Sequence, residues 1–169
     1  MAEAQKDAIA LLKADHREVE DLFEQFEKAS GASKKQRLAQ QICMELTIHA
    51  KIEEEIFYPA CDGKVEKDLL EEAYVEHDGA KVLIAEIEAG APSDDFFDAK
   101  ITVLSEQIEH HIKEEEKRME GIFSQARKAV LDMDALGDQL RARKEALMAQ
   151  FKRDGLSKPE LTTLTETEL

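Results

Sequence analysis

Residues 48–59 read IHAKIEEEIFYP and place His49 four residues before Glu53 on the apolar side of a predicted helix. Residues four apart on a helix project from the same face, so both side chains are expected to point into a core. A buried carboxylate without a partner is costly, and it therefore either becomes protonated or holds a cation. The stretch thus predicts a helical core that contains a cation site.

The composition of the chain favours long amphipathic helices. Its 169 residues are enough for one domain with a substantial core. The chain is 43% hydrophobic and 36% charged, with only 5% aromatic residues, seven Gly and three Pro. Because few residues break helices and few favour strands, an all-α fold is expected.

The charge of the chain restricts its partners. A formal net charge of −15 and a pI near 4.8 argue against nucleic acid and anionic membranes, because phosphates are repelled. No apolar run approaches the roughly 18 residues of a membrane span, and the first residues lack a signal-peptide pattern. Cys43 and Cys61 lie about 27 Å apart along one predicted helix, beyond disulfide reach. We therefore expect reduced thiols and a cytoplasmic protein.

Helical periodicity predicts five helices, at about residues 3–29, 33–58, 65–89, 94–122 and 132–151. The second should end or kink at Tyr58–Pro59, because the residue before a proline avoids helical geometry. The fourth carries Met119 and Ile122 on its apolar line. Gly79 in the third costs about 1 kcal/mol relative to Ala, and close approach of a neighbouring helix would explain it.

Short connections between the first four helices predict an antiparallel up-down-up-down four-helix bundle with an additional C-terminal helix. We expect the bundle to span residues 1–130 and the extra helix residues 131–154. The tail, residues 155–169, is polar, contains Pro159 and has no sustained period. We expect this tail to be mobile.

Each predicted bundle helix carries one inward histidine: His16, His49, His77 and His111. A glutamate four residues after a histidine is weak evidence alone, because 38 of the 169 residues are acidic. The apolar line separates the pairs. His111 and Glu115 share their line with isoleucine and leucine, whereas the line through His110 includes glutamine and lysine.

A lone histidine on an apolar face is more often a hydrogen-bonded core residue than a ligand. Four of them with two inward glutamates instead favour a pair of first-row metal ions, bridged by the carboxylates and open to a small ligand. A structural zinc ion would not need six donors. The chain also lacks His-Glu-x-x-His, and no histidine follows a glutamate by three residues as in ferritin-like di-iron proteins. The candidate ligands are His16, His49, Glu53, His77, His111 and Glu115.

Four segments carry a family resemblance: DHREVEDLFEQFE (15–27), IHAKIEEEIFYPA (48–60), YVEHDGAKVLI (74–84) and EHHIKEEEKRMEGIF (109–123). Together they resemble the hemerythrin-like family of HHE cation-binding domains over roughly residues 5–130. The resemblance implies a non-haem centre of two iron ions bridged by an oxygen atom. It also implies that O₂ or a related small molecule, nitric oxide or peroxide, binds there. Manganese or a mixed metal pair would suit the same donors.

Two positions depart from oxygen-carrying hemerythrins. Those proteins have a second histidine one turn before the third-helix ligand, where this chain has Ala73. Their second carboxylate is an aspartate one residue further along, where this chain offers Glu115. One iron would therefore lose a protein ligand, and Tyr74 is the nearest candidate to fill the gap, as a hydrogen-bond partner rather than as a ligand. A more open centre favours redox chemistry over reversible oxygen carriage.

Three functions are compatible with these residues. The first is a di-iron binding protein for sensing, storage or redox defence. The second is a di-iron oxidase or peroxidase-like enzyme at the same centre. The third is a metal-free helical scaffold whose fifth helix and tail contact a partner.

Overall fold

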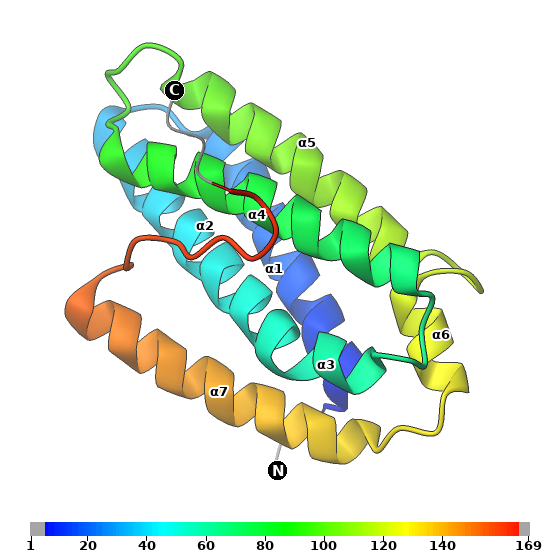
Figure 1. The fold of residues 1–169 in the computed structure, drawn as a ribbon. Coiled ribbons are helices and arrows are strands. Elements are labelled where there is room, and N and C mark those ends of the chain that lie inside the picture. Colours follow the sequence, from blue (N-terminus) through cyan, green and yellow to red (C-terminus); the bar gives the residue numbers. More distant parts are fainter. Residues whose placement is uncertain (1–5, 166–169) are drawn as a thin grey trace.

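The computed structural model describes residues 6–165, which form helices joined by loops, as the sequence predicts (Figure 1). The long helices are α1 (Ala8–Lys28), α2 (Ala32–Ile52), α4 (Lys67–Ala89), α5 (Phe97–Glu116) and α7 (Met133–Asp154). The shorter elements are the π-helical turn η1 (Glu53–Phe57), α3 (Tyr58–Cys61) and α6 (Ile122–Lys128).

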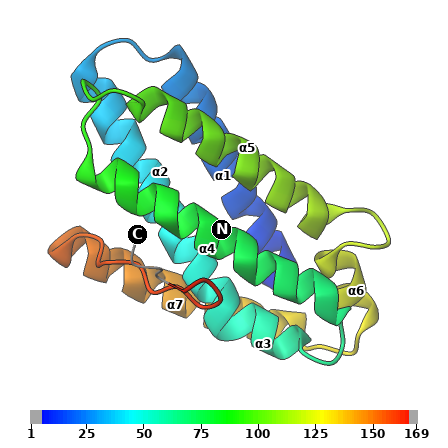
Figure 2. The same ribbon diagram turned by 45° about the horizontal axis from the view of Figure 1, so that its top comes forward.

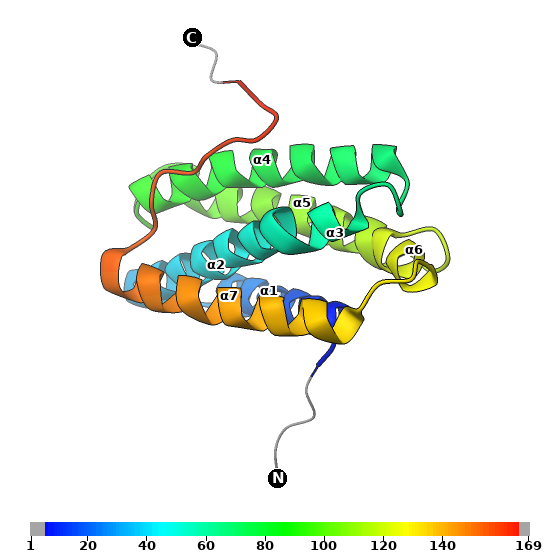
Figure 3. The ribbon, with the colours of Figure 1, turned by 60° about the horizontal axis from the view of Figure 1, so that its bottom comes forward.

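Four of the long helices close into a ring around a shared core. Helix α1 packs on α2, α2 on α4, α4 on α5, and α5 on α1. Helix α7 lies outside this ring against α1, α2 and η1, as Figures 2 and 3 show from two sides. The ring places one face of each helix toward the same interior.

The interior consists of two apolar clusters with a polar layer between them. On α1, residues 8–12 feed one cluster and residues 19–26 feed the other. His16 falls between these two groups, and His49 and His77 occupy the same place on α2 and α4. The amphipathic pattern therefore brings the histidines to one level of the bundle.

The start of α1 is fixed by a side-chain cap. Asp7 accepts a hydrogen bond from the backbone N–H of Ala10 at 2.8 Å, which satisfies one of the free donors at the helix start. Helix α1 thus begins at Ala8. Residues 3–5 of the predicted first helix lie outside the described residues.

Of the two outcomes predicted at Tyr58–Pro59, an end or a kink, the helix end is wrong, because helical residues continue to Cys61 after the π turn. Tyr58 has helical angles of φ −64° and ψ −41°. The turn before it widens, so that the Tyr58 N–H donates to the carbonyl of Glu53, five residues back. Pro59 then lies in the first turn of α3, where its fixed φ suits helical geometry.

The prediction that the fourth helix continues through Met119 and Ile122 is wrong, although Ile122 is buried as predicted. Helix α5 ends at Glu116, Met119 has φ 73° and is 66% exposed, and Ile122 belongs to α6. The chain folds back tightly at Gly121, where a Cβ atom would lie 2.6 Å from the Glu115 carbonyl oxygen. Only glycine fits there, and the helix cannot continue.

The tail is anchored rather than free over the part that the structure describes. Residues 155–165 contain no helix and run back from the end of α7 across α4, the red segment of Figure 1. The backbone N–H groups of Thr162, Thr163 and Leu164 donate to the carboxylate of Asp78. The expectation of a mobile tail therefore missed these contacts, and residues 166–169 lie outside the described residues.

The structure also bears on the two cysteines and on membrane-spanning helices. Cys43 and Cys61 are free and buried. Among residues 6–165, no helix is long and apolar enough to cross a membrane.

Close backbone approach occurs at Gly137 rather than at Gly79. A Cβ atom on Gly137 would lie 2.7 Å from the Lys6 carbonyl oxygen, where α7 meets the segment before α1. A Cβ atom on Gly79 would meet nothing closer than the Gln107 side-chain oxygen at 3.8 Å. The predicted explanation for Gly79 is therefore not supported.

Replacing these two glycines by alanine should change the free energy of unfolding in opposite directions. Gly137→Ala should lower the free energy of unfolding by about 1–3 kcal/mol, because α7 must shift away from α1. Gly79→Ala should raise it by about 1 kcal/mol, the helix-propensity difference. Urea unfolding of the metal-free protein measures both, and a stabilising effect at Gly137 would contradict the close contact.

Candidate metal centre

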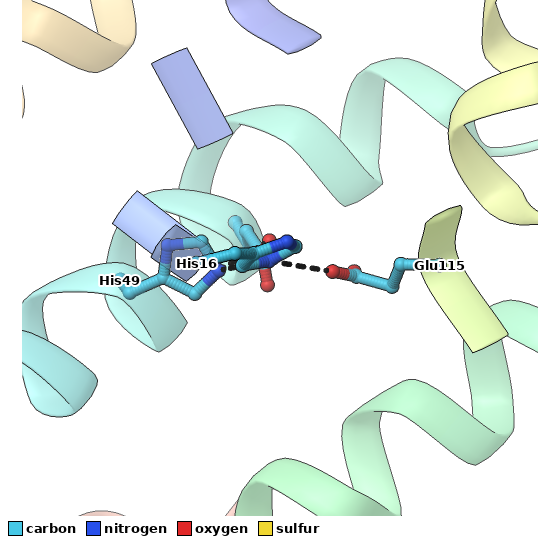
Figure 4. A group of neighbouring side chains, drawn as sticks. His16, His49 and Glu115 are labelled. Carbon is cyan, nitrogen blue, oxygen red and sulfur yellow. Dashed lines mark hydrogen bonds and ion pairs between the residues drawn. The ribbon is translucent and has the colours of Figure 1, made fainter. Parts of the chain in front are cut away.

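Four histidines, one from each helix of the ring, converge in the polar layer. The Nε2 atoms of His16 and His49 lie 3.1 Å apart, and those of His77 and His111 lie 3.2 Å apart. All four side chains are buried. Figure 4 shows His16 and His49 close together, with Glu115 reaching toward them from α5.

Glu53 divides its two carboxylate oxygens between the histidine pairs. Its Oε1 lies 2.8 Å from His49 Nε2, and its Oε2 lies 3.1 Å from His77 Nε2. This side chain is fully buried. A carboxylate in this position can serve two cations at once.

Glu115 occupies a similar bridging place from α5. Its Oε2 lies 3.2 Å from His16 Nε2 and 3.5 Å from His111 Nε2. It is also fully buried. The spacing of four residues to His111 therefore brings both side chains of α5 into the layer, as the sequence predicts.

The six predicted ligands fall into two overlapping groups. In each group, one possible ligand atom per residue lies within 4.8 Å of all the others. One group has four members and the second has three, with Glu53 common to both: His16, His49, Glu53 and Glu115; and Glu53, His77 and His111.

Each histidine also contacts a second, outer carboxylate through its Nδ1 atom. A carboxylate can only accept, so a proton lies on Nδ1, and the inward Nε2 can bind a metal ion once it has lost its own proton. The Nδ1–oxygen distances are 2.7 Å for His16–Glu116, 3.2 Å for His49–Asp15, 3.0 Å for His77–Glu54 and 2.5 Å for His111–Glu76.

The outer carboxylates are the functional residues that the sequence reasoning missed. Each stands directly beside a candidate ligand in the sequence, as Asp15 stands beside His16 and Glu54 beside Glu53. Each nevertheless contacts a histidine on the next helix of the ring. An acid adjacent to four of the six candidate ligands was the available signal.

The electrostatics of the layer favour bound positive charge. Burial alone would lower the pKa of His49, but the charge of Glu53 and the hydrogen bond to Asp15 outweigh it and raise that pKa to about 10. Burial also opposes ionisation of Glu53, yet the neighbouring histidines hold its pKa well below the usual range. The pKa values of His16 and His111 are raised as well, so without metal the protons on these three histidines offset the charge of Glu53.

The unsatisfied atoms of the layer fit a metal pair. Glu53 Oε1 and Glu115 Oε2 are buried and have no hydrogen-bond donor. These same oxygens face the inward Nε2 atoms of His49 and His16. Imidazole and carboxylate donors together suit first-row transition metals. Metal cations would satisfy both kinds of atom.

A tyrosine hydroxyl completes the layer, and it belongs to Tyr58. This hydroxyl donates to Glu53 Oε2 at 2.9 Å or to Glu115 Oε1 at 2.5 Å. Burial first, and then the two carboxylate charges, raise the pKa of Tyr58 well above its usual value, so it keeps its proton. The π turn brings Tyr58 onto the face of Glu53, a spacing that a regular helix would not give.

Sequence comparison agrees with this geometry. The sequence profile of the hemerythrin HHE cation binding domain matches residues 7–123, more than half of the chain. This chain belongs to that family. The match spans all four histidine-bearing helices of the ring and both bridging glutamates.

Two relatives extend the comparison of this HHE domain. A crystal structure of an HHE cation binding domain-containing protein from Mycobacterium kansasii has the same fold, with a TM-score of 0.75 and 22% identity. The superposition covers 89% of this chain and 95% of that one. A Nostoc protein named DNA nickase is 29% identical over 109 residues, which cover 64% of this chain and 31% of the relative. The HHE domain thus spans less than a third of that protein.

Ala73 and Tyr74 take different roles in this HHE domain from those predicted. Ala73 is buried in the apolar cluster below the polar layer. Tyr74 is half-buried and packs edge-on against the Tyr58 ring, with 5.3 Å between the ring centroids. Tyr58 therefore supplies the hydroxyl that had been predicted from Tyr74.

Alanine substitutions at His110 and His111 should have different effects on metal binding. His111→Ala removes an inward Nε2 and should abolish stoichiometric metal binding. His110→Ala should retain it, because the His110 side chain is 65% exposed and contacts only the outer carboxylate Glu76, at 3.5 Å. Metal analysis after gel filtration measures both, and equal loss in the two variants would contradict this assignment.

Proposed function

We propose that this HHE domain holds two iron ions through His16, His49, Glu53, His77, His111 and Glu115. The observation that carries the proposal is the division of the Glu53 oxygens between the two histidine pairs. Fully buried carboxylate oxygens without hydrogen-bond donors add support, because they disfavour a metal-free scaffold. We also propose that the four ring helices, which supply these ligands, run in antiparallel up-down-up-down order.

The two iron positions would differ in openness. The group around His16 and His49 offers four protein donors, whereas the group around His77 and His111 offers three. Ala73, one turn before His77, contributes no donor to the second group. We therefore propose that O₂, nitric oxide or peroxide binds on the side of His77 and His111, for sensing, storage or redox defence.

An oxidase or peroxidase-like enzyme at the same centre is the second candidate. The three-donor group favours it, because open coordination positions allow a substrate and an oxidant to meet there. Strand cleavage of DNA is not proposed. The net charge of −15 opposes contact with phosphates, and the nickase relative is mostly sequence that this chain does not contain.

Metal content and absorption test the proposal. The protein loaded with Fe(II) under anaerobic conditions should bind about two iron ions per chain. Exposure to O₂ should then produce near-ultraviolet and visible absorption typical of an oxygen-bridged ferric pair. A stable protein that stays colourless and metal-free would overturn the proposal, and repeated peroxide consumption would favour the enzyme over the binding protein.

Metal loading should weaken as the pH falls. In the metal-free protein the pKa of His49 is raised to about 10, and that of His111 is raised as well, so metal ions must displace protons from these groups. Loading at pH 8 should therefore release protons, and metal affinity should fall steadily as the pH is lowered below about 10. A pH indicator in weak buffer follows the release, and a flat loading curve down to pH 5 would exclude histidine ligation.

A further inference from the structure

A cleft leads from the surface to the metal centre. Its volume is about 1220 Å³, and its lining includes all four inward histidines. Apolar side chains such as Leu46, Ile84 and Ile108 line part of the rest, together with seven acidic residues and three lysines, an excess of negative charge that disfavours anions. Passage along an apolar wall costs an uncharged molecule little, whereas an ion loses hydration. The cleft therefore suits small uncharged molecules.

The C-terminal segment forms one wall of this cleft. Residues 156–164, here called the strap, leave the end of α7 and cross toward α4 (Figure 3). Residues 156–163 line the cleft. The strap has no helix, and most of its side chains are exposed. It forms part of the cleft wall without contributing a large apolar core.

One buried carboxylate holds the strap in place. Asp78 is fully buried, and its Oδ2 accepts from the Thr163 N–H at 2.5 Å, the Thr163 hydroxyl at 2.7 Å and the Leu164 N–H at 2.9 Å. The Thr162 N–H lies 2.9 Å from Oδ1. Three consecutive backbone donors on one carboxylate make a compact polar latch.

The latch also touches the outer shell of the metal centre. The Thr162 hydroxyl donates to Glu54 Oε2 at 3.2 Å, and Glu54 Oε1 accepts from His77 Nδ1 at 3.0 Å. Lys81 donates to Glu54, to Asp78 and to the Glu160 carbonyl oxygen. The strap is thus connected to the histidine on the more open side of the centre.

We propose that this cleft is the route by which a small uncharged molecule reaches the metal centre, and that the strap is a lid latched by Asp78. The lid can open without unfolding the bundle, because beyond Leu156, which packs against both apolar clusters, it is held by a local group of hydrogen bonds. The destination of the route rests on the proposed iron centre, whereas the latch itself does not depend on metal.

The test weakens the latch by changing only the strap of the full chain. Thr163→Pro removes both the N–H and the hydroxyl that Asp78 accepts, and Thr165→Pro, two residues beyond, is the matched control. In the metal-free protein, amide hydrogen exchange at Thr162 and Leu164 should rise at least tenfold in Thr163→Pro and stay within twofold of wild type in Thr165→Pro. Unprotected exchange at these amides in the wild type would overturn the latch.

The second measurement is the rate at which nitric oxide binds the Fe(II)-loaded protein, followed by stopped flow. Thr163→Pro should raise the association rate at least tenfold with iron content unchanged, and Thr165→Pro should match wild type. Equal rates in all three proteins would overturn the lid. A wild type that binds no iron would instead refute the proposed function, while the exchange result would still decide the latch.

Discussion

The rest of this structure depends on two buried carboxylates, whose negative charge must be balanced inside the bundle. Glu53 and Glu115 are fully enclosed, and each leaves one oxygen without a hydrogen-bond donor. Negative charge in such a place requires positive charge nearby, because the interior cannot replace the lost hydration. The inward histidines supply it as protons in the metal-free protein, and metal ions can take over that role. Charge balance, rather than apolar packing, therefore determines what the centre of the bundle can contain.

The outer carboxylates turn this charge balance into a restraint on the helices. Asp15 on α1 contacts His49 on α2, Glu54 contacts His77 on α4, Glu76 on α4 contacts His111 on α5, and Glu116 on α5 contacts His16 on α1. The contacts close a full circle around the ring. Any helix that slides along its axis would break one contact to each neighbour, so the ring holds the register that aims every Nε2 inward.

Helical periodicity was sufficient to predict the long helices and the convergence of six polar side chains. The pattern of apolar residues distinguishes His111 from its neighbour His110, because burial follows the helix face. Periodicity could not predict Tyr58, since a π turn changes the spacing from which faces are read. Nor could it predict the latch, because Asp78 and Thr162 are far apart in the sequence and meet only where the segment after α7 runs back across α4.

The π turn and the strap solve two problems that the regular bundle leaves. Widening the helix at Glu53–Phe57 adds a hydroxyl donor to the layer, and Pro59 follows in the first turn of α3. Helix α7 covers α1, α2 and η1. The cleft is lined in part by α4, which α7 does not cover. A fully buried cleft would block small molecules, and an open one would admit bulk water to the unsatisfied carboxylates. A short polar strap that is fixed at one buried aspartate can give both states, since its contacts are few and local.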